Sequence, residues 1–433
     1  MHSVGLYTLG CKVSQYETEA VAEAFEAAGF ELRSFDELCD FYVINTCTVT
    51  AESDRKSRQI IRRARKRNPD GVVIVMGCYT QRSPEEVMAI DGVKAVIGTD
   101  NKLSAVAVAT EILNGERESY TSVTDVNTAD FEPMCITRAE RTRAYVKIED
   151  GCECRCTYCA IADARGRVRS KPMEEVISEV EGLSRSGVRE IVLTGIETGS
   201  YGRDLGEGYG LAELILELDR RGSAERIRLG SLAPELIGKS FIEKVRDLKI
   251  LAPHFHLSVQ SGSDGVLRRM KRRYSSAMAL ENIRLIRENI KGAAFTTDLM
   301  VGFPGESEED FLDTVRFAEQ ARFIDAHVFA YSRRRGTPAA DYPDQIDEAT
   351  KRARSERLIE VCHEIRDSVL SEIVERGEAL SLILETYDGE AYAAHADNFA
   401  EVRVKSEDPN LSGEMVIAIP VSHKNGIITA RLI

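Results

Sequence analysis

The chain has 433 residues, of which 43% are hydrophobic and 30% are charged, a balance typical of a globular protein with two or three domains. No run approaches the roughly 20 apolar residues of a membrane span, and residues 1–10 lack the basic start and cleavage site of a signal peptide, so we expect a cytoplasmic protein with no membrane contact. The net charge of −14 argues against diffuse nucleic-acid binding, so any RNA contact needs local basic patches. Ten cysteines in a reducing compartment suit metal binding better than disulfides.

Residues 1–123 alternate apolar runs with amphipathic stretches, which predicts an N-terminal parallel α/β sheet domain. The expected strands are Val4–Leu9, Phe41–Thr46, Val72–Gly77 and Val93–Gly98, with helices such as Gln15–Ala28 and Ser53–Lys66.

Three cysteines, Cys11, Cys47 and Cys78, come just after the first three of these strands. The carboxyl ends of parallel strands share one sheet edge, so these thiols are predicted to converge there as a three-thiolate site. The alternative is three independently buried cysteines, because free cysteine is often buried. Burial is the expectation for Cys39, Cys135 and Cys362, which show no such placement.

A dense basic run follows the second strand. Residues 54–67 hold eight lysines and arginines against one acidic residue. Such a run is commonly a solvated helix face, and the alternative is contact with phosphate beside the cysteine edge. The sequence leaves both open.

A cysteine-rich loop opens the central part of the chain. Cys152, Cys156 and Cys159 have the spacing C-x3-C-x2-C, while Cys154 has no assigned role. Three soft thiolates on one short loop suit a 4Fe–4S cluster with one iron left for another ligand. A zinc knuckle is the alternative, but structural zinc needs four ligands and no second cysteine or histidine pair lies nearby.

Alternation of strands and helices then continues through residues 138–371. The six expected strands are Ala144–Glu149, Glu190–Thr194, Arg226–Leu229, His254–Gln260, Ala294–Val301 and Ala326–Tyr331, with helices such as Met173–Ser186, Leu211–Arg220, Ala277–Ile290 and Glu308–Ala321. This pattern predicts a partial (β/α)6 barrel. Active groups of such barrels lie at the carboxyl ends of the strands, and the cysteine loop follows the first strand.

Further candidate binding residues lie at the ends of these strands. Gly195 and Glu197 end the second strand, where a glycine lets a backbone approach a ligand or simply forms the turn. His256, Ser258 and Gln260 alternate along the fourth strand, so they are predicted to share the face that points into the barrel. Arginines that follow several strands are predicted to meet a polyanion at the barrel mouth: Arg165, Arg167, Arg169, Arg268–Arg273 and Arg333–Arg335.

The last part of the chain changes character. Asp347–Glu375 reads as a long charged helix, and Ala379–Ile433 as short strands separated by turn signals such as Asp388-Gly389 and Asn425-Gly426, which predicts a small β-barrel. Residues 372–433 contain 5 basic and 11 acidic residues, a net charge of −6, so strong phosphate binding by this part is not expected.

These motifs together resemble the methylthiotransferase family of radical S-adenosylmethionine (SAM) enzymes. The resemblance is carried by Thr8-Leu9-Gly10-Cys11-Lys12-Val13-Ser14-Gln15-Tyr16-Glu17-Thr18, Asn45-Thr46-Cys47, Gly77-Cys78-Tyr79 and the Cys152–Cys159 loop. The T-L-G-C-K-V and Q-Y-E-T residues are similar to the MtaB-type branch, although Ser14 stands where that branch usually has asparagine. Residues 372–433 resemble the TRAM domain, an RNA-binding module that closes these enzymes.

The resemblance implies two 4Fe–4S clusters and SAM as cofactors. Cys152, Cys156 and Cys159 would hold the cluster that cleaves SAM to a 5′-deoxyadenosyl radical, and Cys11, Cys47 and Cys78 the cluster that carries sulfur. Tyr158 matches the aromatic residue that packs by the adenine of SAM, and Gly195 would face its methionine part. The implied reaction replaces the C2 hydrogen of N6-threonylcarbamoyladenosine (t6A) beside the tRNA anticodon with a methylthio group, using an electron donor and a sulfur donor. The radical is needed because that C–H is not acidic enough for a side-chain base.

Two other kinds of protein stay open. A radical SAM methylthiotransferase could act on another tRNA adenosine or on a ribosomal-protein side chain, and a non-catalytic iron–sulfur RNA-binding sensor would use the same thiolates. A sensor would not need two clusters that each have one iron without a protein ligand. The tRNA set, the two donors and the oligomeric state are not predicted.

Overall fold

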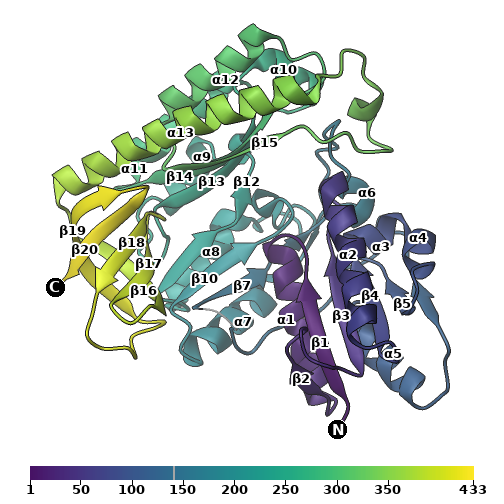
Figure 1. The fold of residues 1–433 in the computed structure, drawn as a ribbon. Helices are drawn as coiled ribbons and strands as arrows, with labels where there is room; N and C mark the ends of the chain where they lie inside the picture. The colour runs from purple at the N-terminus through teal and green to yellow at the C-terminus, as the bar shows by residue number, and fades with distance from the viewer. Residues whose placement is uncertain (140–141) are drawn as a thin grey trace.

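The computed structural model describes residues 1–139 and 142–433, and its first part is a parallel sheet covered on both faces (Figure 1). The strand order is β2-β1-β3-β4-β5-β6, and all pairings are parallel. The strands are β1 (Ser3–Thr8), β2 (Glu31–Arg33), β3 (Phe41–Thr46), β4 (Val72–Gly77), β5 (Val93–Ile97) and β6 (Tyr120–Ser122).

Helices cover this sheet because its central strands are apolar on both sides. Tyr16 and Phe25 of α1 pack on one face, and Ile61 and Ala64 of α2 pack on the other. Strands covered in this way read as continuous apolar runs, which is why β3 and β4 were recognisable in the sequence. The helices are α1 (Lys12–Ala27), α2 (Ala51–Arg67), α3 (Cys78–Arg82), α4 (Pro84–Met88) and α5 (Ser104–Leu113).

The middle of the chain forms a partial barrel from two parallel sheets with the orders β11-β10-β7 and β12-β13-β14-β15. Its strands are β7 (Arg143–Lys147), β10 (Glu190–Thr194), β11 (Arg226–Leu229), β12 (Ser231–Leu232), β13 (His254–Gln260), β14 (Ala294–Val301) and β15 (Asp325–Ala330). A two-stranded antiparallel sheet, β8 (Glu149–Asp150) with β9 (Arg169–Ser170), flanks the cysteine loop. The predicted six-unit partial barrel is confirmed.

Helices surround the outside of the barrel. They are α6 (Ile161–Arg165), α7 (Met173–Arg185), α8 (Leu211–Arg221), α9 (Lys239–Val245), α10 (Asp264–Arg269), α11 (Ser276–Asn289) and α12 (Glu308–Ala321), with 3-10 turns at Thr198–Ser200, Pro234–Leu236 and Pro338–Asp341. Alternate strand residues such as Val146, Leu193 and Leu257 belong to the apolar core under these helices. Most positions between them are polar, such as Lys147, Thr194 and His256, so polar groups line much of the barrel lumen.

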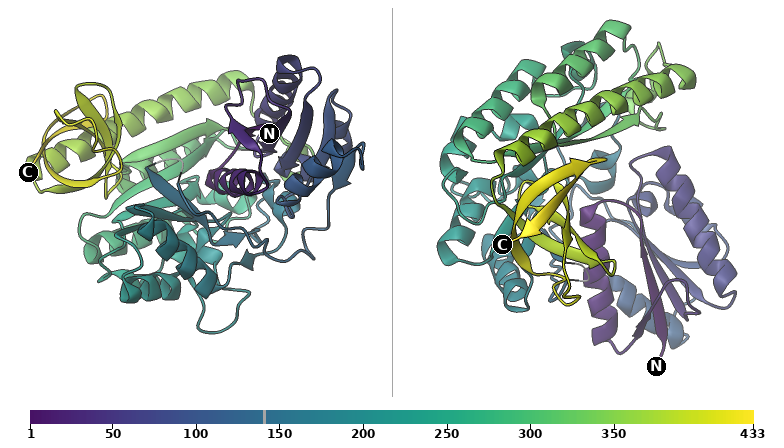
Figure 2. Two further views of the ribbon diagram at one scale, coloured as in Figure 1. Left: turned by 90° about the horizontal axis from the view of Figure 1, so that it is seen from below. Right: turned by 60° about the vertical axis from the view of Figure 1, so that its left-hand side comes forward.

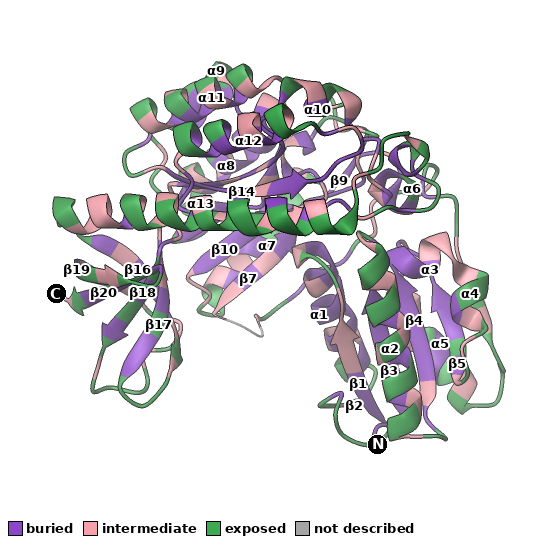
Figure 3. Ribbon diagram, turned by 45° about the horizontal axis from the view of Figure 1, so that its top comes forward, coloured by how far each residue is buried: buried purple, intermediate pink, exposed green. Residues whose placement is uncertain are grey.

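Helix α13 (Glu348–Arg376) crosses the outside of the molecule and leads to a closed five-stranded barrel (Figures 1 and 3). Its strands are β16 (Leu380–Tyr387), β17 (Ala391–Ala396), β18 (Glu401–Lys405), β19 (Met415–Lys424) and β20 (Ile427–Leu432), as predicted for the C-terminal part. Figure 2 shows this barrel and the N-terminal sheet flanking the central part at its two ends. Within the described residues, no helix combines the length and the apolar surface needed to cross a membrane.

The closed barrel packs under the amino ends of the central strands. Glu190 is fully buried; it accepts hydrogen bonds from Arg228 at 2.9 Å and Arg226 at 3.1 Å and forms an ion pair with Arg143 at 2.9 Å. The same arginines reach the closed barrel: Arg143 pairs with a carboxylate of β16, Arg226 donates to a serine hydroxyl of β16, and Arg228 donates to the carbonyl of Asp397. This ion cluster therefore joins the two barrels.

Glu190→Gln tests this junction. The three guanidinium groups hold the pKa of Glu190 at about 2, against the cost of burial and below the roughly 4.3 of an unfolded chain. Glu190 thus stabilises the fold above about pH 4.3, and this contribution is lost as the pH falls toward 2. Removing one partner of a buried pair costs about 3 kcal/mol or more, so thermal unfolding at pH 7 should occur at a clearly lower temperature in the variant.

The matched control is Glu217→Gln. Glu217 also pairs with two arginines, Arg220 and Arg221, but on the exposed surface of α8, where water and salt screen the pair. The control should unfold like the wild type. Equal unfolding temperatures for Glu190→Gln and wild type at pH 7 would show that the junction does not stabilise the fold.

Candidate active site

Three cysteines, Cys11, Cys47 and Cys78, lie at the carboxyl ends of neighbouring strands, as predicted. Cys11 follows β1 and is the residue just before α1, Cys47 follows β3, and Cys78 is the first residue of α3 after β4. The loops approach closely, because a Cβ atom added to Gly10 would lie 3.3 Å from the Cβ of Cys47. Cys11 is exposed, Cys47 is partly buried and Cys78 is buried, so the group runs from the surface inward.

Cys78 is the cysteine with the most constrained surroundings. Its pKa is raised to about 12, chiefly by burial; Arg165 opposes the shift, and the neighbouring Cys47 and Cys11 add to it. Arg165 donates from Nε to the Sγ of Cys78 at 3.2 Å. A buried thiol of this kind stays protonated until a metal displaces its proton.

The second cysteine group lies on the loop after β8. Cys156 is buried and its Sγ accepts from Arg272 at 3.4 Å, while the Sγ of Cys159 accepts from the backbone of Ile161 at 3.4 Å. The neighbouring Cys154 raises the pKa of Cys152, and Cys152 lowers the pKa of Cys154 to about 6. Cys154 thus acts on the titration of the candidate ligand Cys152 and is not itself one of the predicted ligands.

No three cysteine, histidine or acidic side chains in residues 1–139 and 142–433 are close enough together to hold a metal ion as they stand. The donor chemistry nevertheless fits an iron–sulfur cluster at both places. Each group offers three thiols on short segments, the soft ligand type that such clusters select. Each also has a basic side chain, Arg165 or Arg272, that donates to a cysteine sulfur.

Tyr158, Gly195 and Glu197 lie around the second cysteine group. Tyr158 packs edge-on against Phe303, with ring centroids 6.4 Å apart. A Cβ on Gly195 would come within 2.4 Å of a carboxylate oxygen of Glu149, so this glycine is required by a close side chain of the protein itself. Burial raises the pKa of Glu197 to about 7, although its carboxylate accepts from the backbone of Ala233 at 3.0 Å.

His256, Ser258 and Gln260 lie on β13, but not in strict alternation. His256 binds Thr296 at 2.9 Å and faces Asp298, which places it in the barrel lumen. Ser258 accepts at its carbonyl from Arg272 at 2.7 Å. The register shifts between Leu257 and Gln260, and Gln260 has a φ of +69°, so a bulge rather than regular pleating sets its direction.

Two residues of this site were missed in the sequence. Glu149 is fully buried beside Gly195, and one of its carboxylate oxygens has no hydrogen-bond partner in the described part of the chain. Arg272 was predicted to meet a polyanion at the barrel mouth, yet it contacts Cys156. The available signal for Glu149 was an acidic pair, Glu149-Asp150, at the end of an apolar strand directly before the cysteine loop.

The prediction that the mouth arginines meet a polyanion is wrong for three of them. Arg165, Arg169 and Arg334 are buried, and their guanidinium groups pair with carboxylates or carbonyls of the protein. Arg334, for example, pairs with Asp54 of α2 at 2.7 Å and so joins the first sheet to the end of β15. Burial expected for Cys39 and Cys362 is found, whereas Cys135 is exposed.

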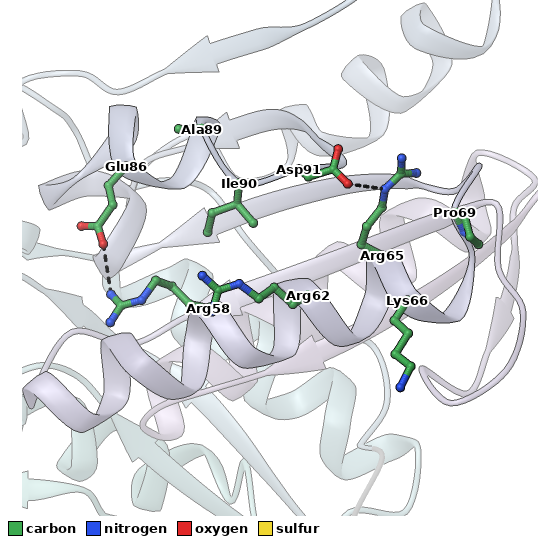
Figure 4. Close-up of a pocket in the computed structure, with 9 residues that line it drawn as sticks. All are labelled: Arg58, Arg62, Arg65, Lys66, Pro69, Glu86, Ala89, Ile90 and Asp91. Carbon is green, nitrogen blue, oxygen red and sulfur yellow. Dashed lines mark hydrogen bonds and ion pairs between the residues drawn. The ribbon is translucent and has the colours of Figure 1, made fainter.

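The basic helix α2 keeps an open outer face (Figure 3). A groove of about 850 Å³ runs between α2 and α4, lined by Arg58, Arg62, Arg65, Lys66, Pro69, Glu86, Ala89, Ile90 and Asp91 (Figure 4). Arg58 pairs with Glu86 and Arg65 with Asp91, while Arg62 and Lys66 have no carboxylate within ion-pair distance among the described residues. The run is therefore partly a solvated, ion-paired face and partly open to an anion.

Comparison with known proteins agrees with this architecture. Residues 146–318 match the Radical SAM superfamily, and residues 3–98 match the uncharacterized protein family UPF0004. The radical SAM methyltransferase TsrM from Kitasatospora setae has the same overall fold, with a TM-score of 0.56 over 78% of this chain and 77% of TsrM at 17% identity. The fold and the cysteine loop together define a radical SAM protein, which implies SAM and a 4Fe–4S cluster.

Curated relatives narrow the class. The chain is 41% identical to the threonylcarbamoyladenosine tRNA methylthiotransferase MtaB of Bacillus subtilis, over 96% of this chain and 93% of the relative. The corresponding Thermotoga maritima protein is 35% identical over the full length of both. A tRNA-2-methylthio-N(6)-dimethylallyladenosine synthase of Acetivibrio thermocellus is 36% identical, over 86% of this chain and 79% of the relative. The chain belongs to the radical SAM methylthiotransferase family.

Cys154→Ser separates the candidate ligands from their neighbour. If Cys152, Cys156 and Cys159 are the ligands, serine at position 154 should leave the iron content of the anaerobically reconstituted protein unchanged, because it changes only a neighbour of Cys152. Cys152→Ser should lose about half of the iron, one cube of two. The reverse pattern, with iron lost only in Cys154→Ser, would reassign the ligand.

Proposed function

We propose that this protein is a tRNA methylthiotransferase that converts t6A beside the anticodon to its 2-methylthio derivative. The observation that carries the proposal is the pair of three-cysteine groups, one at the carboxyl edge of the N-terminal sheet and one at the carboxyl end of the first barrel strand. Two such groups suit a reaction that needs both a radical and a sulfur. Relatives named for this activity, 35–41% identical over most of the chain, support it.

A second candidate substrate is dimethylallyladenosine in tRNA. Relatives named for that substrate reach 36% identity, close to the more distant relatives named for t6A. We favour t6A because the 41% relative carries that name and because Thr8-Leu9-Gly10-Cys11-Lys12-Val13 has the form of the t6A branch. We propose a cytoplasmic location, where the enzyme would find its tRNA substrate, an electron donor and a sulfur donor.

The proposed ligand sets follow the sequence prediction. Cys152, Cys156 and Cys159 would hold one cluster, and Cys11, Cys47 and Cys78 would hold a second. When bound, the clusters and SAM supply the electron, the radical and the sulfur that no side chain can provide. We place the boundaries of the three domains at residues 1–123, 138–371 and 372–433, with the last a TRAM-like module.

The chain itself would bind, orient and shield the reactants. Tyr158 and Phe303 form an apolar wall beside the second cysteine group that excludes water. We assign Gly195, Glu197, His256, Ser258 and Gln260 to SAM or substrate contact. With a pKa of about 7, the Glu197 carboxyl can accept a proton or hydrogen-bond from an ammonium group near neutral pH. An adenosine would have to leave its loop stack to enter the lumen, at modest cost in an anticodon loop.

Replacing each cysteine group separately tests the division of labour. The intact protein should bind about eight irons per chain, and Cys152, Cys156 and Cys159 changed together to Ala should leave about four. Cys11, Cys47 and Cys78 changed together to Ala should stop methylthiolation but still allow reductive cleavage of SAM to 5′-deoxyadenosine. Both products are measured by chromatography and mass spectrometry.

Several results would contradict this division. Methylthiolated product from the Cys11/Cys47/Cys78 variant would remove the sulfur role from that group. Zinc in place of iron, or loss of all iron in either triple variant, would contradict two separate clusters. SAM left uncleaved by the reduced wild-type protein would favour a non-catalytic sensor.

Helix α2 is our proposed main contact for tRNA. Removing one protein–phosphate ion pair lowers the slope of log affinity against log salt by roughly 0.7 to 0.9. Changing Arg62, Arg63, Arg65 and Lys66 to Ser should therefore weaken tRNA binding and flatten the slope, because Arg62 and Lys66 are open to an anion and Arg63 and Arg65 add positive charge beside them. The measurement is tRNA affinity over a range of salt concentrations.

The matched control removes four exposed basic residues from the C-terminal barrel, where acidic residues predominate. These residues are Arg403, Lys405, Lys424 and Arg431. The control should flatten the slope much less. A larger effect in the control than in the α2 variant would place the main phosphate-binding surface on the C-terminal barrel.

A further inference from the structure

Beneath Cys78 lies a buried group of charges between the N-terminal sheet and the barrel. At its centre is Glu17 of α1, which is fully buried. Its carboxylate accepts from both terminal nitrogens of Arg165, at 2.5 Å and 3.1 Å, from Lys147 at 2.9 Å and from Lys102 at 3.1 Å. One carboxylate therefore gathers cations from the N-terminal sheet, from β7 and from α6.

A second carboxylate completes the group. Asp150 accepts from Lys147 at 2.6 Å and Arg165 at 3.1 Å, and it lies 3.6 Å from Arg169. Four cations thus share two carboxylates, which leaves a formal excess of two positive charges in the interior. Burial raises the pKa of the next carboxyl, Glu132, and lowers that of Lys102. Buried charge without a counter-ion is costly, so the group favours an anion beside it.

Arg165 directs this excess charge toward the cysteines. Its two terminal nitrogens are occupied by Glu17 and Asp150, and its Nε donates to the Sγ of Cys78. Hydrogen bonds to ligand sulfurs and nearby charge set the potential of an iron–sulfur cluster. Arg165 also stands six residues after Cys159, at the end of α6. This short helix therefore links the second cysteine group to the residue that contacts Cys78.

We propose that Arg165 is a positioning residue that fixes Cys78 against the barrel and supplies positive charge to a cluster on Cys11, Cys47 and Cys78. This inference rests on the proposed function, because it needs that cluster. A purely structural arginine would be satisfied by the two carboxylates alone. The additional donation to sulfur makes the potential of the cluster depend on residue 165.

The test uses the protein with Cys152, Cys156 and Cys159 changed to Ala, so that iron binds only at the N-terminal group. Arg165→Gln, Arg165→Lys and Arg167→Gln are added singly. Arg167 is the matched control, because it is a nearby arginine that donates to the backbone carbonyls of Asn127 and Ala129 and pairs with the exposed Asp130. Iron content, the electron paramagnetic resonance spectrum and the midpoint potential are measured for each protein.

Arg165→Gln should shift the midpoint potential to a more negative value, because removal of a nearby cation disfavours the added electron. Arg165→Lys keeps the positive charge but lacks the several N–H donors of a guanidinium group, so it should shift the midpoint potential less. Arg167→Gln should leave the midpoint potential unchanged. If Arg165→Gln holds no iron, the test uses the midpoint potential of Arg165→Lys instead. A potential that differs from that of the parent protein supports the proposal, and an unchanged potential overturns it. An unchanged potential in iron-loaded Arg165→Gln also overturns it. Absence of a cluster when Arg165 is intact would instead contradict the proposed second cluster.

Discussion

The contact between Glu17 and Arg165 is the interaction on which the arrangement of this protein depends. Each residue stands just after a cysteine segment, Glu17 six residues beyond Cys11 and Arg165 six residues beyond Cys159. Both are fully buried, so each charge needs a buried partner of opposite sign, and the two hydrogen bonds between them supply one. Their pairing turns the carboxyl edge of the N-terminal sheet toward the carboxyl end of the barrel strands. Two cysteine groups that are 74 residues or more apart in the sequence are thereby held at the boundary between the N-terminal sheet and the barrel.

The opposite end of the barrel is closed by a second buried ion cluster. Glu190 and its arginines join the first residues of the central strands to the C-terminal barrel, and Phe399 of that barrel stacks on His254 with ring centroids 4.5 Å apart. Phe399 has a φ of +74°, an uncommon conformation for a bulky residue, which the surrounding contacts must hold in place. This ion cluster covers the amino ends of the barrel strands, at the opposite end from the Cys152–Cys159 loop.

The sequence was sufficient for the fold and for the positions of the cysteines. The buried runs of β3 and β4 and the positions of Cys47 and Cys78 after them needed only local pattern. The three-residue strands β2 and β6 were missed, because such short edge strands carry too little pattern to detect. The bulge before Gln260 was also missed, since no glycine marks it.

The fate of the arginines could not be predicted from local pattern. Arg165 and Arg334 follow strands as surface cations would, but their partners, Glu17 and Asp54, lie 148 and 280 residues away. Only the folded chain shows that these charges are neutralised inside the protein. Helix α2 differs, because its partners Asp36, Glu86 and Asp91 are on its own domain and leave Arg62 and Lys66 open.

The most direct test is nucleoside mass spectrometry after incubation of the reconstituted, reduced protein with SAM, a sulfur source and two tRNAs, one carrying t6A and the other N6-dimethylallyladenosine. Methylthio product should form on the t6A tRNA, with 5′-deoxyadenosine formed in parallel. Product on the dimethylallyladenosine tRNA alone, or 5′-deoxyadenosine with no modified nucleoside on either tRNA, would contradict the proposed function.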